Sequence, residues 1–437
     1  MDFSLSNDAI GIIGCVALLA LVLLGVRVYV AAALVGLLGI VALIGWDAGA
    51  GLVGTIPHSK SVNYTLSVLP LFILIGYLAF HAGMTQTLFD AAKKWLGWLP
   101  GGLAIATIFA VAGFSAVSGA ATAAAAVFAR VAIPEMLKEN YDRRLAAGVT
   151  AAGATLDSLI PPSAIMVVYA IIVEASIGKL LIAGFIPGLI SALCYCLIVI
   201  GWCTWNPNVG RAISGFTWRE RFASLPGTLP VIAVVVIIFA SMLFGWATPT
   251  EAGALGAFVV YIAALINRMK FAQLNDALLE TAKLTVMIFA IIWGILIFVR
   301  FLGFAGVPEH FSEWVVSLPL EPWQIMVGIL FVYLVLGCFM DGIGMLLLTL
   351  PVFYPAVIKL GYDPIWFGII VVKMVGVCLI TPPIGLSCFV VGAVRRDIPL
   401  SDVFRGVLPF VLADFLAIAI FMIWPELITW LPDQMVR

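Results

Sequence analysis

The chain has 437 residues, of which 64% are hydrophobic and only 10% are charged. A soluble domain carries roughly 25% charged residues, so this composition excludes an ordinary water-soluble protein. The net charge of −1 likewise excludes a basic nucleic-acid-binding surface. Several continuously apolar runs reach the ~20 residues that a helix needs to cross a bilayer, and they do not alternate in polarity as barrel strands do.

In chain order, these runs predict membrane helices at 9–26, 29–46, 66–90, 145–173, 180–202, 229–245, 252–266, 282–300, 365–394 and 407–430. Two more apolar stretches, 101–133 and 323–360, are interrupted at Ser118-Gly119 and at Asp341-Gly342-Ile343-Gly344. Each stretch either spans twice or returns as a re-entrant hairpin. If both interrupted stretches return to the side they entered from, the connections rich in Lys and Arg all lie on one side of the membrane, which is expected to be the cytoplasmic side. Both termini are then expected outside the cytoplasm.

Residues 221 positions apart match in one ungapped frame, which indicates an internal duplication. The matched residues are Pro134 with Pro355, Lys138 with Lys359, Tyr141-Asp142 with Tyr362-Asp363, Pro161-Pro162 with Pro382-Pro383, and Ile177 with Ile398. Each half holds five full spans, an odd number, so the copies are expected to insert in opposite senses. Inverted repeats with broken helices are typical of secondary transporters.

Double prolines stand in the middle of two predicted spans, at Pro161-Pro162 in 145–173 and at Pro382-Pro383 in 365–394. Proline lacks a donor and clashes with the preceding turn, so the helix must break there. Broken backbone at membrane depth requires cover by protein or by a water-filled cavity. Freed carbonyls suit a small cation, and half-helix N-termini suit an anion. The alternative is a structural kink, which a single proline explains.

Charged residues inside apolar runs are candidates for function. Asp157 and Asp341 stand at the breaks, where a carboxylate ligates a cation, relays a proton or caps a half-helix. Lys373 is expected to face a cavity or to pair with a carboxylate, and Asp414 is a candidate for the membrane interface. The small residues around Ser118 permit either a tight reversal or close helix packing. The scattered His and Cys residues predict no zinc site and no disulfide.

Several short motifs together resemble the large membrane subunit of tripartite ATP-independent periplasmic (TRAP) transporters. The likeness runs from about Pro70 to Pro409. It is carried by Pro70-Leu71-Phe72-Ile73-Leu74-Ile75-Gly76-Tyr77, Ser118-Gly119-Ala120-Ala121-Thr122-Ala123, Ile160-Pro161-Pro162-Ser163, Phe185-Ile186-Pro187-Gly188, Asp341-Gly342 and Thr381-Pro382-Pro383-Ile384-Gly385.

The resemblance implies an all-α, elevator-type transporter of the bacterial cytoplasmic membrane that uses a sodium gradient to import organic acids. It favours re-entrant hairpins over full spans in both interrupted stretches. It also implies two partners, a small four-helix membrane subunit and a periplasmic substrate-binding protein. Because this chain starts directly with the large-subunit part, the small subunit is expected to be a separate chain. The expected divisions are scaffold helices at 1–65 and 206–280, and repeats at 66–205 and 281–437.

The resemblance also implies site residues where hairpin tips meet the broken helices. The sodium-binding candidates are Ser118, Gly119, Gly153, Asp157 and Pro161 in one half, and Asp341, Gly342, Gly376, Thr381 and Pro382 in the other. The substrate-binding candidates are Thr122, Pro162, Ser163 and Pro383. Family members often carry glycine near position 157 and an acidic residue near position 376, so a carboxylate shifted between the two breaks is expected.

Three other functions compete with sodium-coupled import. A proton-coupled carrier of organic anions would use Asp157 and Asp341 as relays. An integral membrane enzyme would need a cluster of His, Asp or Glu near one interface, which the sequence lacks, so no enzyme is expected. A channel would show flux without saturation. No GxxxxGK[ST] loop is present, so a gradient rather than ATP is expected to drive transport.

Overall fold

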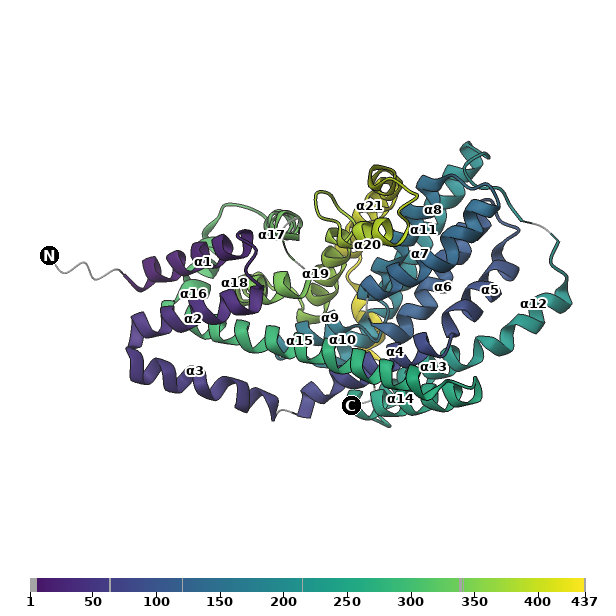
Figure 1. Ribbon diagram of the computed structural model, residues 1–437. Helices are drawn as coiled ribbons and strands as arrows, with labels where there is room; N and C mark the ends of the chain where they lie inside the picture. The colour runs from purple at the N-terminus through teal and green to yellow at the C-terminus, as the bar shows by residue number, and fades with distance from the viewer. Residues whose placement is uncertain are drawn as a thin grey trace.

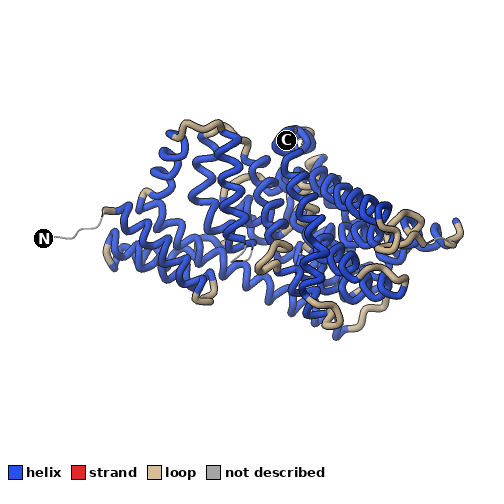
Figure 2. Tube along the Cα trace, turned by 90° about the horizontal axis from the view of Figure 1, so that it is seen from above, coloured by secondary structure: helices blue, strands red, loops and turns tan. Residues whose placement is uncertain are grey.

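The structure, a computed structural model, describes residues 6–62, 64–119, 121–213, 215–337, 340 and 342–435. Every regular element within these ranges is helical, as the all-α prediction requires. Figure 2 shows the helices joined by short loops in an elongated body. Asp341 lies outside the described residues, so the structure does not place this predicted ligand.

Helices of the first half end at Trp205. In chain order they are α1 (Asn7–Leu23), α2 (Val28–Ile44), α3 (Trp46–Ser61), η1 (Tyr64–Ser67), α4 (Val68–His81), α5 (Met84–Leu96), α6 (Gly102–Ser118), α7 (Ala121–Lys138), α8 (Arg143–Ala154), η2 (Thr155–Ser158), α9 (Ala164–Ile172), α10 (Ile177–Ala183) and α11 (Phe185–Trp205).

Helices of the second half begin after a loop. They are α12 (Trp218–Ser224), η3 (Leu225–Gly227), α13 (Leu229–Leu243), α14 (Pro249–Ile266), α15 (Phe271–Ala305), α16 (Val307–Ser317), α17 (Pro322–Gly337), α18 (Gly342–Lys359), α19 (Pro364–Cys378), α20 (Leu386–Val394), α21 (Leu400–Ile423) and α22 (Glu426–Asp433).

The elongated body has two ends (Figure 1). Helices α1, α2 and α3 lie at one end beside α16, and α5 to α8 with α11 lie toward the other. The 35-residue helix α15 runs from the first end to the centre and packs on both α2 and α4.

Length and hydropathy make five helical segments of the described chain suitable for crossing a membrane, or seven if two bent helix pairs count as one span each. Shorter apolar helices, among them α1 and α2, coincide with predicted spans. The lipid-facing surface is apolar: Leu197 and Leu412, for example, are each 68% exposed. The orientation of the termini stays a prediction.

Two features of the first quarter differ from the sequence prediction. The span expected at 66–90 is bent by 70° between α4 and α5, where Gly83 adopts a left-handed φ of +73°. Helix α3 was not predicted, because its residues are far less apolar than those of α2 and include Pro57. Membrane hydropathy alone therefore misses helices of mixed polarity.

Both interrupted stretches form pairs of helices that pack on each other, α6 with α7 and α17 with α18. One pair of residues matched by the 221-residue offset has the same local role. Asp142 caps α8 by accepting a hydrogen bond from the Arg144 amide, and Asp363 caps α19 by accepting from two amides. The duplication and the inverted insertion of its copies stay predictions.

Helices α8 and α21 hold the centre of the molecule together. The Asp402 side chain at the start of α21 is almost fully buried and lies 2.7 Å from Arg143 Nε and 3.1 Å from Arg144 Nε. One turn further along, a Cβ at Gly406 would overlap the Arg144 carbonyl, so only glycine allows this close approach. The α8–α21 contact fixes the position of the first proline break, which follows α8.

Candidate functional site

The double proline interrupts the first predicted broken helix. Helix α8 ends at Ala154, η2 continues to Ser158, and α9 starts at Ala164. Residues 159–163, here named the first break, are not helical because two successive prolines provide no amide donors. Ser163 is 1% exposed, and its hydroxyl finds no hydrogen-bond partner among the described residues. An unpaired buried hydroxyl is unfavourable unless something else binds it.

The tip of the α6–α7 helix pair covers this break. Ser118 Oγ donates a hydrogen bond of 3.1 Å to Asp157 Oδ1, and both side chains are at least 95% buried. Gly119 follows with a left-handed φ of +59°, and a Cβ there would lie 3.0 Å from the Pro162 carbonyl oxygen. The structure thus brings a hydroxyl, a carboxylate and a backbone carbonyl of the predicted site together.

Helix α4 supports the tip from the other side. A Cβ at Gly76 would lie 2.5 Å from both the Cα and the carbonyl oxygen of Ser118. Only glycine allows α4 to approach the tip backbone this closely. Gly76 belongs to the Pro70–Tyr77 motif, so that motif has a packing role at the tip.

The second double proline also ends a helix, but its surroundings differ. Helix α19 ends at Cys378 and α20 starts at Leu386, so residues 379–385 form the second break. Pro382 and Pro383 are exposed, in contrast to their buried counterparts. The Thr381 hydroxyl donates to the Val377 carbonyl at 2.7 Å. The second break is therefore open to its surroundings in the described part of the chain.

The described residues of the second helix pair pack on α19. Gly342 lies against the Val375 side chain, and Gly337 lies against the Cys378 side chain. Gly376 points elsewhere: a Cβ there would lie 3.0 Å from Ser158 Oγ and 3.5 Å from the Thr155 carbonyl oxygen. The two broken helices thus cross at Gly376, which lies against η2 just before the first break.

A buried ion pair lies beside this crossing. Lys373 Nζ lies 2.5 Å from Asp414 Oδ1, and both side chains are at least 97% buried. Tyr195 donates a 2.6 Å hydrogen bond to the same carboxylate oxygen, and its hydroxyl lies 3.0 Å from Thr155 Oγ1. We call these four residues the Lys373 network. The pairing expected for Lys373 is confirmed, whereas the interfacial position considered for Asp414 is wrong.

The remaining predicted residues are spread more widely. Gly153 is in α8 and packs on the Val111 side chain of α6. Pro161 is buried in the first break, and Thr122 is exposed in the first turn of α7. Of the predicted substrate-binding residues, only Pro162 and Ser163 lie at the covered break.

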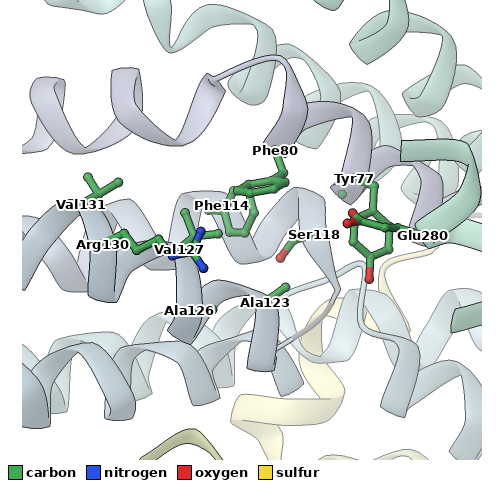
Figure 3. Close-up of a pocket in the computed structure, with 11 residues that line it drawn as sticks. Tyr77, Phe80, Phe114, Ser118, Ala123, Ala126, Val127, Arg130, Val131 and Glu280 are labelled. Atoms are coloured by element: carbon green, nitrogen blue, oxygen red, sulfur yellow. The ribbon is translucent and has the colours of Figure 1, made fainter. Parts of the chain in front are cut away.

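A cavity of about 370 Å³ opens beside the Ser118 tip, between helices α4, α6, α7 and α15 (Figure 3). Its polar lining residues are Tyr77, Ser118, Arg130 and Glu280. Sequence analysis missed Arg130, although an arginine within an apolar stretch is itself a signal of function. It also missed Tyr195, for which no sequence signal exists, because its role depends on tertiary contacts.

Comparisons with known proteins agree with this arrangement. The sequence profile described as "Tripartite ATP-independent periplasmic transporter, DctM component" matches residues 15–427. The C4-dicarboxylate TRAP transporter large permease protein DctM of Pseudomonas aeruginosa is 36% identical over 85% of each chain. The sialic acid TRAP transporter large permease protein SiaM of Vibrio cholerae is 30% identical over 85% of this chain and 87% of its own.

Solved structures support the fold at low sequence identity. The YdaH transporter of Alcanivorax borkumensis matches with a TM-score of 0.57 and 14% identity, over 88% of this chain and 90% of its own. MtrF of Neisseria gonorrhoeae matches with a TM-score of 0.55 and 14% identity, over 97% of this chain and 96% of its own. The profile match over nearly the whole length and the relative that is 36% identical show that the chain belongs to the DctM family of large membrane subunits of TRAP transporters.

Proposed function

We propose that this chain imports an organic acid by alternating access, coupled to a sodium gradient. As a DctM-family permease with several apolar helices, it is a multi-pass protein of the inner membrane and not an enzyme. The single observation that carries the proposal is the Ser118–Asp157 contact, with the Gly119 backbone resting on the Pro162 carbonyl. This contact links a movable tip to a break whose oxygens suit a cation.

The first break has the donor set that a hard cation prefers. Such cations take oxygen ligands from carboxylates, carbonyls and hydroxyls. Asp157 provides a buried carboxyl group, Ser118 a hydroxyl and Pro162 a carbonyl. The unpaired Ser163 hydroxyl adds a further oxygen within the same break. Sodium bound here would connect tip and break, and so order the tip before substrate binds.

Relatives point to the substrate class and to the partners. The names of two relatives specify C4-dicarboxylates and sialic acid, which are both organic acids. A relative in Oleidesulfovibrio alaskensis is an isethionate permease named DctMQ, of which this chain covers 56%. We propose that this chain receives its acid from a periplasmic binding protein and works with a small membrane subunit.

The movement we propose is a sliding of one helix group against another. The α6–α7 and α17–α18 pairs, with the two broken helices, would form the moving part. Helices α1 and α2, with α13 and α14, would form the frame together with the small subunit. The Lys373 network supports this division, since it ties both broken helices into one body.

Uptake into proteoliposomes tests the coupling. The permease, its small subunit and its binding protein are reconstituted, and uptake of 3-hydroxybutyrate, succinate and N-acetylneuraminate is measured under a sodium gradient or under a proton gradient. We expect sodium to drive uptake at equal pH on both sides. Asp157→Asn keeps a partner for Ser118 but removes the negative charge, so the sodium concentration for half-maximal uptake should rise by about tenfold or more.

The matched control is Asp433→Asn, which removes an exposed carboxylate from α22 and should leave the sodium dependence unchanged. Uptake driven by the proton gradient without sodium, and abolished by Asp157→Asn, would instead support the proton-coupled carrier. Sodium dependence that is identical in Asp157→Asn and the native protein would exclude the first break as the coupling site.

A further inference from the structure

The cavity beside the Ser118 tip has the size and lining of a site for a small molecule. Its volume of about 370 Å³ is near the lower limit for ligand pockets. Phe80, Phe114 and Val127 provide apolar walls, and the Ser118 side chain lies between the two ends of the cavity in Figure 3. The cavity therefore reaches the hairpin tip directly from the surface of the described chain.

Positive charge in the cavity lining comes from Arg130 alone among the described residues. No ion pair or hydrogen bond joins this guanidinium to another described side chain. The neighbouring acidic residue of α7, Glu135, is already paired with Lys93 at 2.6 Å. Arg130 therefore offers an unneutralised fork of donors, which matches a carboxylate in geometry and charge.

The opposite end of the cavity carries negative charge. Figure 3 shows Glu280 and Tyr77 at the end facing away from Arg130. Glu280 Oε2 lies 3.1 Å from His81 Nε2, and this contact fixes the carboxylate on α15 next to α4. A second carboxylate on a ligand would meet Glu280 and be repelled, whereas a hydroxyl or amino group would be accepted.

We propose that Arg130 binds the carboxylate of a small monocarboxylate, while Glu280 and Tyr77 bind a hydroxyl or amino group at its other end. This assignment rests on the proposed function and narrows its substrate class. It makes Arg130 the anion-binding residue and Glu280 the residue that discriminates against dicarboxylates. The apolar walls between them contact the carbon chain of the ligand.

Binding of two acids of equal carbon number tests the assignment. The permease with its small subunit is titrated with 3-hydroxybutyrate and with succinate in the presence of sodium. We expect 3-hydroxybutyrate to bind more tightly. Arg130→Gln should weaken its binding by about tenfold or more, since a hydrogen-bonded charge is lost. Glu280→Gln keeps a partner for His81 and should raise the affinity for succinate relative to 3-hydroxybutyrate.

Lys138→Gln is the matched control, because it removes an exposed positive charge from the same helix at a residue that does not line the cavity. Native binding in Arg130→Gln, or tighter binding of succinate than of 3-hydroxybutyrate, would overturn the assignment. Sodium-driven uptake of another acid would then still support the proposed function. If neither acid binds the native complex, the assignment is wrong, and the uptake assay decides the proposed function separately.

Discussion

The two proline breaks share a sequence pattern but differ in their surroundings. Pro162 and Ser163 are buried beneath the Ser118 tip, whereas Pro382 and Pro383 are exposed. The prolines determine where each helix ends, because this effect is local to the backbone. Whether a break is covered depends on residues distant in sequence. The double-proline motif thus specifies a break, whereas the cover over that break depends on tertiary packing.

Crossing of the broken helices explains part of this difference. Gly376 follows Lys373 by three residues in α19, and its backbone lies against Thr155 and Ser158. The η2 turn that precedes the first break is therefore supported by α19, and the break itself lies beneath the Ser118 tip. Residues 338, 339 and 341, at the tip of the second helix pair, lie outside the described residues.

The largest effect is expected for the Lys373 network. Lys373→Met leaves the buried Asp414 carboxylate without its cation, which should destabilise the protein by about 3–5 kcal/mol. The double change Lys373→Met/Asp414→Leu should recover much of the loss, because no unpaired charge remains. Melting temperatures in detergent measure the stability of the single and the double variant. A single variant as stable as the native protein would contradict the role given to this ion pair.

Loss of the Lys373 network should also loosen the residues around the first break. Thr155 contacts Tyr195, so releasing Tyr195 should increase amide hydrogen exchange in residues 155–160. Exchange that stays unchanged in the first break, despite a lower melting temperature, would separate the network from the site.

An intermediate effect is expected where the helices cross. Gly376→Val places atoms against Ser158 and Thr155, and overpacking of this kind costs about 1–3 kcal/mol. Gly303→Val is the matched control, because no atom lies within 4 Å of a Cβ at Gly303 in α15. Uptake and melting temperature should fall only for the first variant. Equal effects would show that the crossing is not tight.

The smallest effect is expected for the proline pair itself. Pro162→Ala removes buried atoms beneath the Gly119 tip and should cost about 1 kcal/mol, whereas Pro383→Ala changes an exposed residue and should stay within about 0.5 kcal/mol. Melting temperatures of the two variants, compared directly, test the asymmetry. The reverse order would mean that the second break is the better packed one.

Local chemistry explains which sequence predictions succeeded. Both breaks fall where the double prolines predict them, because the effect of proline on a helix depends on adjacent residues. The family resemblance placed the Ser118 tip beside Asp157, and the two side chains are hydrogen-bonded. Sodium binding at that pair remains a proposal.

Long-range packing explains what the sequence did not provide. The contact of Gly376 with Thr155 and Ser158 of η2 joins residues more than 200 positions apart, and no local pattern in the sequence indicates it. Asp414 was considered interfacial because its partners Lys373 and Tyr195 are far away in sequence. Arg130 was overlooked because its significance depends on a cavity formed by four helices.

The contact of Gly376 with Thr155 and Ser158 has a consequence for the history of the molecule. If the halves arose by duplication, they have not been free to diverge independently, because a larger residue at 376 requires smaller ones at 155 and 158. Natural variation at these three positions should therefore be correlated. A gene encoding only one half would lack the partner surface that holds its broken helix in place.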